Sequence, residues 1–501
     1  MGGSQCRPGM RGCPAFCEDG SSKAPEECDD GNTVNTDDCT NQCKLARCGD
    51  GVVWAGHEQC DDGNTASGDG CSGRCTWEPK ALAGGYDFDC ALGFNGSVKC
   101  WGANSQGQLG LGDTQSRGDQ AGQMGDNLPA VDLGTGRTAT QLAASNVGRS
   151  ACAILDDGTV KCWGNNLLGT LGLGDAQNRG DQPGEMGDNL PTISLGTGRT
   201  AKAIAKGSLS TCALLDNGTV RCWGHNDHGQ LGLGDTNSRG AALGQMGDNL
   251  PAVDLGTGRT AQAIVAGDES TCALLDDGTV KCWGFNAVYN GHTGLGLGDT
   301  ENRGDGPAQM GDNLPAVDFG TGRKARMLAA GDESICALLD NGALKCWGSN
   351  SRGGLGLGDT ASRGGQPGQM GDNLPAVDLG TGHTAKSIAG GNYWSRALLE
   401  NGAIKCWGYN FSGELGLGDD NSRGNQPGQM GDNLPTVNLG TMRTARALSV
   451  TGGTTCALLD DGTCKCWGDN EFGQLGLGDT NNRGDQPNEM GDNLPVVELT
   501  F

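Results

Sequence analysis

The amino-acid sequence predicts an all-β protein, a seven-bladed β-propeller preceded by a small disulfide-rich N-terminal region. Three observations support this fold class. A unit of about 60 residues recurs seven times, each unit consists of short apolar runs separated by turn residues, and 24 cysteines recur at ordered spacings. The 93 glycines among 501 residues also argue against long helices, because glycine destabilises a helix interior.

The charge and hydropathy of the chain exclude two classes of function. Lys and Arg number 35 against 60 Asp and Glu, for a net charge of −25, so a nucleic-acid backbone or an anionic membrane surface would repel the chain. No run of apolar residues reaches the roughly 18 needed for a transmembrane helix. We therefore expect neither nucleic-acid binding nor membrane insertion.

The N-terminal region, residues 1–76, holds ten cysteines, and eight of them form two copies of one pattern, at residues 17–43 and 48–75. A segment this short buries little apolar core, so we expect disulfides to stabilise it. Zinc is the alternative, but each copy has one close cysteine pair where zinc sites favour two. The spacing leaves the disulfide connectivity open. The eight cysteines are Cys17, Cys28, Cys39, Cys43, Cys48, Cys60, Cys71 and Cys75.

Several aspartates in the turns of this region are candidate oxygen ligands for a structural Ca²⁺ ion. No 12-residue loop of EF-hand spacing is present, and solvated acidic turns are the favoured interpretation. We therefore predict no cofactor, with structural Ca²⁺ as the alternative. The aspartates are Asp29, Asp30, Asp61, Asp62 and Asp69.

The two N-terminal copies resemble a small secreted cysteine-rich repeat of the CGDG…EQCDDGN…DGCS..C type. The second copy matches closely, whereas the first departs at Cys17-Glu18 and Asp38-Cys39. The resemblance implies a secreted or cell-surface location, and ordered cysteines are typical of oxidising compartments. The first ten residues lack the apolar core of a secretory signal, so we interpret the start of the chain as truncated, processed or misassigned.

After a linker at residues 77–80, the chain repeats one unit seven times over residues 81–501. A Cys-Trp-Gly triplet marks the equivalent position in each unit, and successive triplets are 60 to 64 residues apart. Units that recur at a fixed period stack on their neighbours, because none buries its apolar face alone. Seven units predict a closed ring. The triplet tryptophans are Trp101, Trp163, Trp223, Trp283, Trp347, Trp407 and Trp467.

One unit illustrates the predicted strands. Residues 263–267, 271–275 and 280–284 are short apolar or alternating runs, and an Asp-Asp-Gly-Thr turn separates the last two. A fourth run follows at residues 314–319. We therefore predict four strands in each blade and few exposed sheet edges.

The unit resembles the regulator of chromosome condensation repeat. The signature G-x-N-x-x-G-Q-L-G-x-G-D stands at residues 102–113, 224–235 and 468–479. The resemblance covers residues 81–501 and implies a seven-bladed propeller. Members of the family include a secreted inhibitor of a β-lactamase, a nucleotide exchange factor that docks on chromatin, and a plant ultraviolet sensor. We interpret the triplet tryptophans here as packing between blades rather than as a light-absorbing site.

Six units carry two cysteines at C-x9-C spacing across the predicted hairpin turn. Residues opposite each other on paired strands lie near the separation that a disulfide requires, so we predict six hairpin disulfides, with buried free cysteines as the alternative. In the sixth unit Arg396 replaces the first cysteine and leaves Cys406 alone, and the seventh unit carries an extra Cys464. We favour free thiols at both over a bond between blades. The predicted pairs are Cys90–Cys100, Cys152–Cys162, Cys212–Cys222, Cys272–Cys282, Cys336–Cys346 and Cys456–Cys466.

Catalytic and metal-binding motifs are absent from the sequence. The five histidines do not recur at equivalent positions, and there is no HExxH, GxSxG or P-loop motif. His225 and His228 would hold a metal only if a third ligand such as Asp227 joined them, and their loop is not helical. The paired aspartates and the four Arg-Gly-Asp tripeptides fit turn positions. We therefore predict a protein that is not an enzyme and binds no metal.

The seven copies within one chain provide an internal comparison. The Asp-Asp-Gly-Thr turns hardly change, whereas the loop before the second strand and the segment after Cys-Trp-Gly vary most. In an up-and-down blade both connections emerge on one face, and loops on a fixed scaffold commonly carry binding residues. The alternative is random sequence drift in unconstrained loops. Drift explains the variation, but it explains less readily why many of the few aromatic residues lie in these loops. The candidate partner-binding residues are Tyr86, Phe88, Arg149, Phe285, Tyr289, His292, Tyr393, Trp394, Tyr409, Phe411 and Phe472.

We therefore predict a non-catalytic extracytoplasmic protein that binds a macromolecule, by preference a protein, through the variable loops. Exposed aromatic side chains such as Tyr393 and Trp394 would anchor the partner. One alternative is an intracellular exchange factor for a small GTPase, which the net charge and the cysteines disfavour. The other is a structural cell-surface protein that binds nothing specifically.

Overall fold

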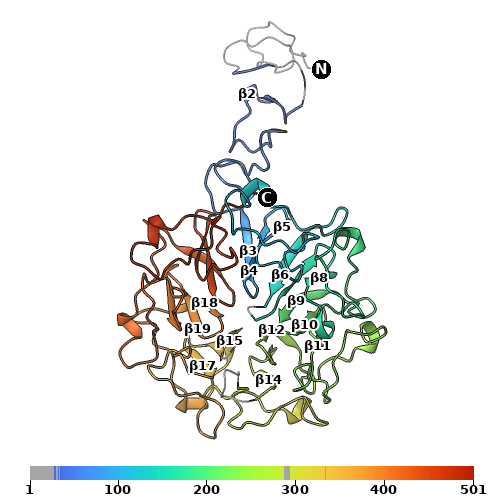
Figure 1. Ribbon diagram of the computed structural model, residues 1–501, viewed down its shortest axis with the longest axis vertical. Coiled ribbons are helices and arrows are strands. Elements are labelled where there is room, and N and C mark those ends of the chain that lie inside the picture. The colour runs from blue at the N-terminus through green and yellow to red at the C-terminus, as the bar shows by residue number, and fades with distance from the viewer. Residues whose placement is uncertain (1–26, 30–31, 33, 146, 287–293, 333) are drawn as a thin grey trace, which may run out of the picture.

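The computed structural model describes residues 27–29, 32, 34–145, 147–286, 294–332 and 334–501. Seven three-stranded antiparallel sheets form a ring, and the N-terminal region extends from the rim of the ring beside the first sheet (Figure 1). The all-β fold with seven blades is confirmed. Within the described residues, no helix is long and apolar enough to cross a membrane.

Each blade consists of three strands in sequence order, and the innermost strands surround a central channel of about 320 Å³. The first four blades comprise β3 (Pro79–Gly84), β4 (Phe88–Gly93) and β5 (Val98–Gly102); β6 (Ala139–Ala144), β7 (Ser150–Leu155) and β8 (Val160–Gly164); β9 (Ala201–Lys206), β10 (Ser210–Leu215) and β11 (Val220–Gly224); and β12 (Ala261–Ala266), β13 (Ser270–Leu275) and β14 (Val280–Gly284). The last three comprise β15 (Ala325–Ala330), β16 (Ser334–Leu339) and β17 (Leu344–Gly348); β18 (Ala385–Gly390), β19 (Trp394–Leu399) and β20 (Ile404–Gly408); and β21 (Ala445–Val450), β22 (Thr454–Leu459) and β23 (Cys464–Gly468). The first blade thus begins at Pro79, inside the segment predicted as a linker.

A short 3-10 helix of sequence Gly-Asp-Asn follows the outer strand of every blade, and blade two has one more. These helices are η1 (Gly125–Asn127), η2 (Leu167–Gly169), η3 (Gly187–Asn189), η4 (Gly247–Asn249), η5 (Gly311–Asn313), η6 (Gly371–Asn373), η7 (Gly431–Asn433) and η8 (Gly491–Asn493).

The Asp-Asp-Gly-Thr turns join the middle and outer strands. In blade two the carboxylate of Asp157 accepts hydrogen bonds from the backbone N–H and the hydroxyl of Thr159, at 3.0 and 2.6 Å. Gly158 adopts a φ of 77°, in the left-handed region that favours glycine. The paired aspartates of these turns therefore stabilise the hairpins, which agrees with their interpretation as turn residues.

The predicted fourth strand is wrong. Residues 314–319 form no strand, and a single backbone bond, from Val317 N–H to Val280 O at 2.8 Å, joins this segment to the outer strand β14. Pro315 lacks an N–H group and so cannot donate to a ladder. The same single bond recurs in the other blades, for example from Val131 N–H to Val98 O. The segment therefore covers the sheet edge without extending the sheet.

The triplet tryptophans join neighbouring blades, which confirms their interpretation as packing residues. All seven are completely buried. The indole Nε1–H of Trp163 in blade two donates to the backbone carbonyl of Gln108 in blade one at 3.0 Å, and the same bond occurs at every tryptophan of the set except Trp347. In every blade but the fifth, one aromatic side chain thus bonds the blade to the one before it.

The six predicted hairpin disulfides are all present. Each joins directly opposed residues of a middle and an outer strand, with Cα–Cα distances of 4.0 to 4.1 Å. Cys406 and Cys464 are buried free thiols, in agreement with the favoured interpretation. In blade six Arg396 lies opposite Cys406 in the strand register, at the position where the other blades form the bond.

The N-terminal region contains two short strands, β1 (Cys39–Thr40) and β2 (Lys44–Leu45), and three described disulfides. In the second copy the first cysteine is bonded to the fourth and the second to the third; in the first copy the second is bonded to the third. The described residues thus give the complete pairing of the second copy and one bond of the first. The bonds are Cys48–Cys75, Cys60–Cys71 and Cys28–Cys39.

Backbone donors surround the carboxylate of Asp61, one of the candidate Ca²⁺ ligands. It accepts hydrogen bonds from the N–H groups of Gly49, Asp50, Gly51 and Gly63, at 2.8 to 3.1 Å. These bonds lower the pKa of Asp61 even though burial acts to raise it. The carboxylate of Asp61 therefore organises the backbone of this turn.

Candidate partner-binding face

The two variable connections of each blade lie together on one face of the ring. The backbone N–H of Tyr409, just after Cys-Trp-Gly, donates to the carbonyl of Tyr393 in the loop between the first two strands, at 3.1 Å. The corresponding bond joins Asn165 to Arg149 at 2.9 Å. Because the bond recurs in further blades, the loops whose sequences vary most form one surface. We call this surface the variable-loop face.

Phe88 and Trp394 are buried, and their prediction as partner-contacting residues is wrong. Their exposed fractions are 0% and 3%, and they occupy the first position of the middle strand, where the other blades carry serine or threonine. Gly85 and Gly391 make room for them, since a Cβ atom at either glycine would collide with the aromatic ring. The two rings therefore pack within the fold and cannot anchor a partner.

The other predicted residues are partly or fully exposed where the structure describes them. Tyr86, Phe285, Tyr393 and Tyr409 are partly buried, and Arg149, Phe411 and Phe472 are exposed. Tyr289 and His292 lie outside the described residues.

One group of these side chains spans blades five and six. The rings of Tyr409 and Phe411 stack with centroids 6.3 Å apart, and Tyr393 meets Tyr409 edge-on at 6.1 Å. The guanidinium of Arg352, from blade five, lies 5.2 Å from the centroid of Tyr409, within the range of a cation–π contact. We call these four residues the aromatic cluster. Arg352 was missed in the sequence because nothing in its own repeat indicates that it reaches an aromatic ring of the next.

A second group lines a hollow of about 350 Å³ between the first three blades. The guanidinium of Arg149 lies 5.2 Å from the ring centroid of Tyr86 and 3.8 Å from the carboxylate of Asp87. Burial raises the pKa of Asp87 to about 6, and the positive charge of Arg149 opposes that rise. Leu167, which sequence comparison did not single out, adds an exposed apolar side chain to the hollow.

The third group lies on blades three and four. The rings of His228 and Phe285 are 4.6 Å apart, and His228 Nε2 lies 3.6 Å from the carboxylate of Glu269. His225 instead lies 3.1 Å from Asp227. The two histidines therefore have different carboxylate partners, and the described residues do not bring them together as metal ligands.

The arginines of the Arg-Gly-Asp tripeptides are engaged within their own repeats. Arg117 forms an ion pair with Asp113 at 2.7 Å, and the equivalent pair occurs in all seven repeats, including the three without the tripeptide aspartate. This supports their interpretation as part of a structural turn.

Carboxyl groups with raised pKa values occur at the junction of blades six, seven and one. Burial raises the pKa of Glu414 and of Asp469, and it raises the pKa of the fully buried Asp89 to about 8. Among the described residues, none of these three forms an ion pair. Burial outweighs the positive charge of Arg396, which acts to lower the pKa of Asp89 and of Glu414. Among the described residues we find no arrangement of nucleophile, base and oxyanion donors around them.

Models of the regulator of chromosome condensation (RCC1) repeat match several parts of the propeller. One model matches residues 201–230, 261–290, 328–353 and 446–474, and a second matches residues 217–274. In the N-terminal region a domain of unknown function, DUF4215, matches residues 2–44 and 40–76.

Relatives and solved structures agree with these matches. The chain is 31% identical over 339 residues to the ultraviolet-B receptor UVR8 of Arabidopsis thaliana, covering 66% of this chain and 66% of the receptor's length. The structure of human WBSCR16 aligns with a TM-score of 0.57 and 18% identity, over 80% of this chain and 93% of that chain. Prp20p of Saccharomyces cerevisiae aligns with a TM-score of 0.51 and 19% identity, over 74% and 80%. Repeats, fold and sequence similarity agree, and the chain belongs to the family of proteins built from RCC1 repeats.

Proposed function

We propose that this protein is a non-catalytic binding protein whose variable-loop face contacts a protein partner. The observation that carries the proposal is the aromatic cluster of Arg352, Tyr393, Tyr409 and Phe411. Aromatic and arginine side chains dominate the binding energy of protein interfaces. Phe411 is 72% exposed. The chain contains few aromatic residues, and most of its tryptophans are buried. Phe411 stacks on Tyr409, which in turn meets Tyr393, and exposed apolar side chains that lie together mark interaction sites more often than single ones.

The charge of the chain restricts the partner. A net charge of −25 repels acidic surfaces at long range and speeds association with basic ones. The partner in this proposal therefore presents an apolar pocket for Phe411 and Tyr409 inside a neutral or basic rim.

We further propose that the protein acts outside the reducing cytosol, as a secreted or cell-surface protein. The support is the number of its disulfides, with one in six of the seven blades and three in the described part of the N-terminal region. Structural disulfides persist in oxidising compartments and are rare in the cytosol.

The proposal is tested by capture with immobilised protein, followed by affinity measurement with the captured partner. The double variant Tyr409→Ala, Phe411→Ala should weaken binding by roughly tenfold or more, because each ring is the type of residue whose truncation costs over 1 kcal/mol at an interface. The melting temperature should hardly change, since the rings lie at the surface.

Met442→Gly is the matched control. It removes a large apolar side chain that is 89% exposed, from a link between blades on the opposite face. Equal binding by the double variant and the wild type would contradict the proposed face. Loss of binding in the control as well would show that any apolar truncation reduces capture.

Exchange of guanine nucleotides on a small GTPase is the second candidate. This candidate is favoured by the fold that the chain shares with Prp20p. The structure of Prp20p was described together with its binding to Gsp1p and histones. Faster nucleotide release from members of a GTPase panel would support this function, and no acceleration across a broad panel would exclude it in practice. A structural protein of the cell surface would show neither activity.

A further inference from the structure

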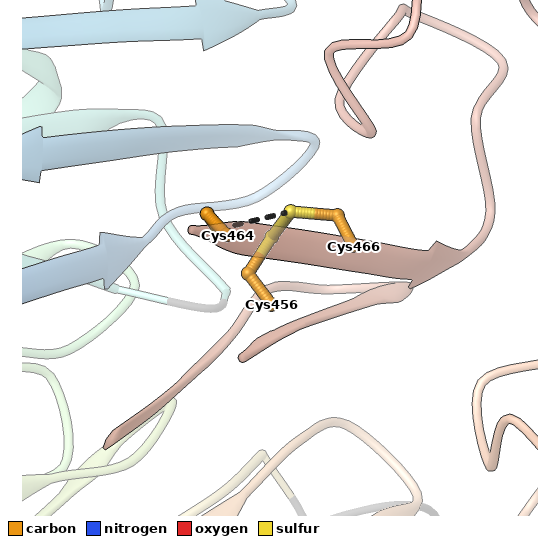
Figure 2. Close-up of side chains that lie close together, drawn as sticks. All are labelled: Cys456, Cys464 and Cys466. Carbon is orange, nitrogen blue, oxygen red and sulfur yellow. Dashed lines mark hydrogen bonds between the residues drawn. A yellow bond between two sulfur atoms is a disulfide. The ribbon is translucent and has the colours of Figure 1, made fainter. Parts of the chain in front are cut away.

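Three cysteine sulfurs meet in blade seven. Cys456 of β22 and Cys466 of β23 form the hairpin disulfide, and Cys464 projects from β23 toward the same bond (Figure 2). The Sγ atoms of Cys464 and Cys466 are 3.9 Å apart, and all three sulfurs lie within 4.8 Å of one another. Their side chains are buried. No other hairpin disulfide has a third sulfur, because the position of Cys464 holds Val98, Val160, Val220, Val280, Leu344 or Ile404 in the other blades.

A carboxylate of blade one lies beside one of these sulfurs. The carboxylate of Asp89 in β4 places Oδ2 at 3.5 Å from Cys456 Sγ, while its Oδ1 accepts a hydrogen bond from the Ser449 hydroxyl at 3.3 Å. Asp89 is completely buried and is the only acidic residue at this strand position in the seven blades. The extra thiol and the buried carboxylate therefore occur together, on the two sides of the contact that closes the ring.

We propose that Cys456, Cys464, Cys466 and Asp89 bind one tetrahedral thiophilic divalent cation, such as Zn²⁺ or Cd²⁺, once the Cys456–Cys466 disulfide is reduced. Two ligand sulfurs on a tetrahedral zinc ion at about 2.3 Å each lie roughly 3.8 Å apart, and a sulfur and a carboxylate oxygen lie about 3.6 Å apart. The observed separations are 3.9 Å between Cys464 and Cys466 and 3.5 Å between Asp89 and Cys456. Two of the ligand-to-ligand distances that a tetrahedral cation requires are therefore already present in the structure.

The site is controlled by the redox state of the blade. A dithiol reductant transfers two electrons and two protons, the disulfide opens to two thiols, and the dithiol becomes a cyclic disulfide. The cation then displaces the protons of three thiols and any proton on Asp89, which go to solvent. Four anionic ligands around a divalent ion leave a charge of −2, and the buried Arg396 contributes positive potential at Asp89. In the oxidised protein two of the three sulfurs carry no charge and are poor ligands.

The test uses the full-length chain and two variants that copy other blades. Cys464→Val places in blade seven the residue of Val98, and Asp89→Ala places in blade one the residue of Ala151, so neither is foreign to the fold. All three proteins are reduced anaerobically with a phosphine, freed of reductant and titrated with Cd²⁺. Native mass spectrometry counts the bound ions, and alkylation mapped by peptide mass spectrometry reports which cysteines the ion protects.

The wild type should hold one more tightly bound Cd²⁺ than Cys464→Val, with Cys456, Cys464 and Cys466 protected together. Asp89→Ala should keep the sulfur ligands and bind roughly tenfold more weakly. The Cys272–Cys282 pair, which faces Val280, serves as an internal control for protection by burial alone. Equal stoichiometry and equal protection in the wild type and Cys464→Val would overturn the proposal.

Reduction opens the other disulfides too, so folding is followed by the near-ultraviolet circular dichroism of the buried tryptophans. If reduction weakens this signal, Cd²⁺ should restore it in the wild type and not in Cys464→Val, because the ion stabilises the state that binds it. A signal that Cd²⁺ restores in neither protein, or equally in both, would contradict the site.

Discussion

The indole Nε1–H of Trp101 donates to the backbone carbonyl of Gln474, 373 positions later in the chain, at a distance of 2.9 Å. The same hydrogen bond, from a triplet tryptophan to a backbone carbonyl of the preceding blade, occurs in every repeat but one. Here it joins the first blade to the last. Within the part of the chain that the structure describes, no strand is exchanged between the first and last blades, since each sheet consists of consecutive strands. The ring is therefore closed by the same side-chain contact that stacks the repeats.

Trp101→Phe should destabilise the protein by about 1–3 kcal/mol beyond the loss of ring volume, because the buried carbonyl of Gln474 is left without its donor. Trp347→Phe is the matched control: Trp347 is equally buried, but its Nε1 has no hydrogen-bond partner among the described residues. Urea unfolding of both variants measures the difference. Equal losses of stability would show that the tryptophans act by volume alone.

Met442→Gly should stabilise the protein by about 1 kcal/mol. Met442 has a φ of 57°, in the left-handed region, and it occupies the link position that holds glycine in the five preceding links. A side chain there is strained, and since Met442 is exposed its removal sacrifices little packing. Met442→Ala, which keeps a Cβ atom, should show little of this gain in thermal unfolding; an equal gain would refute strain as the cause.

Arg396→Cys should create the seventh hairpin disulfide. Residue 396 lies opposite Cys406 in the strand register, and a bond there should add about 2–4 kcal/mol while removing a buried guanidinium whose Nε and Nη1 have no hydrogen-bond partner. The check is peptide mapping under non-reducing conditions together with thermal unfolding. Arg396→Ala separates the two effects, since it removes the guanidinium without adding a bond. A variant in which Cys406 still reacts as a free thiol would contradict the prediction.

The stability that Asp89 and Asp87 contribute should fall as the pH rises from about 4 to 8. Burial raises the pKa of Asp89 from 3.8 to about 8 and that of Asp87 to about 6, so at these two groups the native state binds more protons than the unfolded state. Stability then decreases with pH, by about 1.4 kcal/mol for each unit by which the native pKa exceeds the unfolded one.

Asp89→Asn retains the shape of the side chain and removes the titration. Its urea midpoint should vary less with pH than that of the wild type, with the largest gain at pH 8. Parallel pH profiles for the two proteins would show that Asp89 does not hold its proton in the folded state.

The repeat structure of the sequence predicted most of the fold, because one period determines all seven blades. Strand pairing across the hairpin turns predicted that Cys90 lies opposite Cys100. The same register predicted that Arg396 lies opposite Cys406, so that blade six lacks the hairpin disulfide. The fourth strand could not be predicted correctly, since one backbone bond from Val317 holds a segment that resembles a strand in its apolar pattern.

The exposed side chains of the variable-loop face were predicted less well, because exposure depends on neighbours that a repeat does not reveal. Phe88 and Trp394 belong to variable segments, yet Gly85 and Gly391 leave space that draws both rings inside. Arg352 reaches Tyr409 across a blade boundary, and no pattern within one unit indicates that contact. Sequence comparison thus located the face, and packing decided which of its side chains meet the solvent.

We propose that this disulfide-bonded propeller binds its partner outside the cytosol. The most direct test is the number of free thiols in protein isolated from its natural source, counted by intact mass after alkylation with and without reductant. We predict that Cys406 and Cys464 are the free thiols of the propeller and that the six hairpin pairs are oxidised. Finding most of the 24 cysteines reduced would contradict it and favour an intracellular regulator.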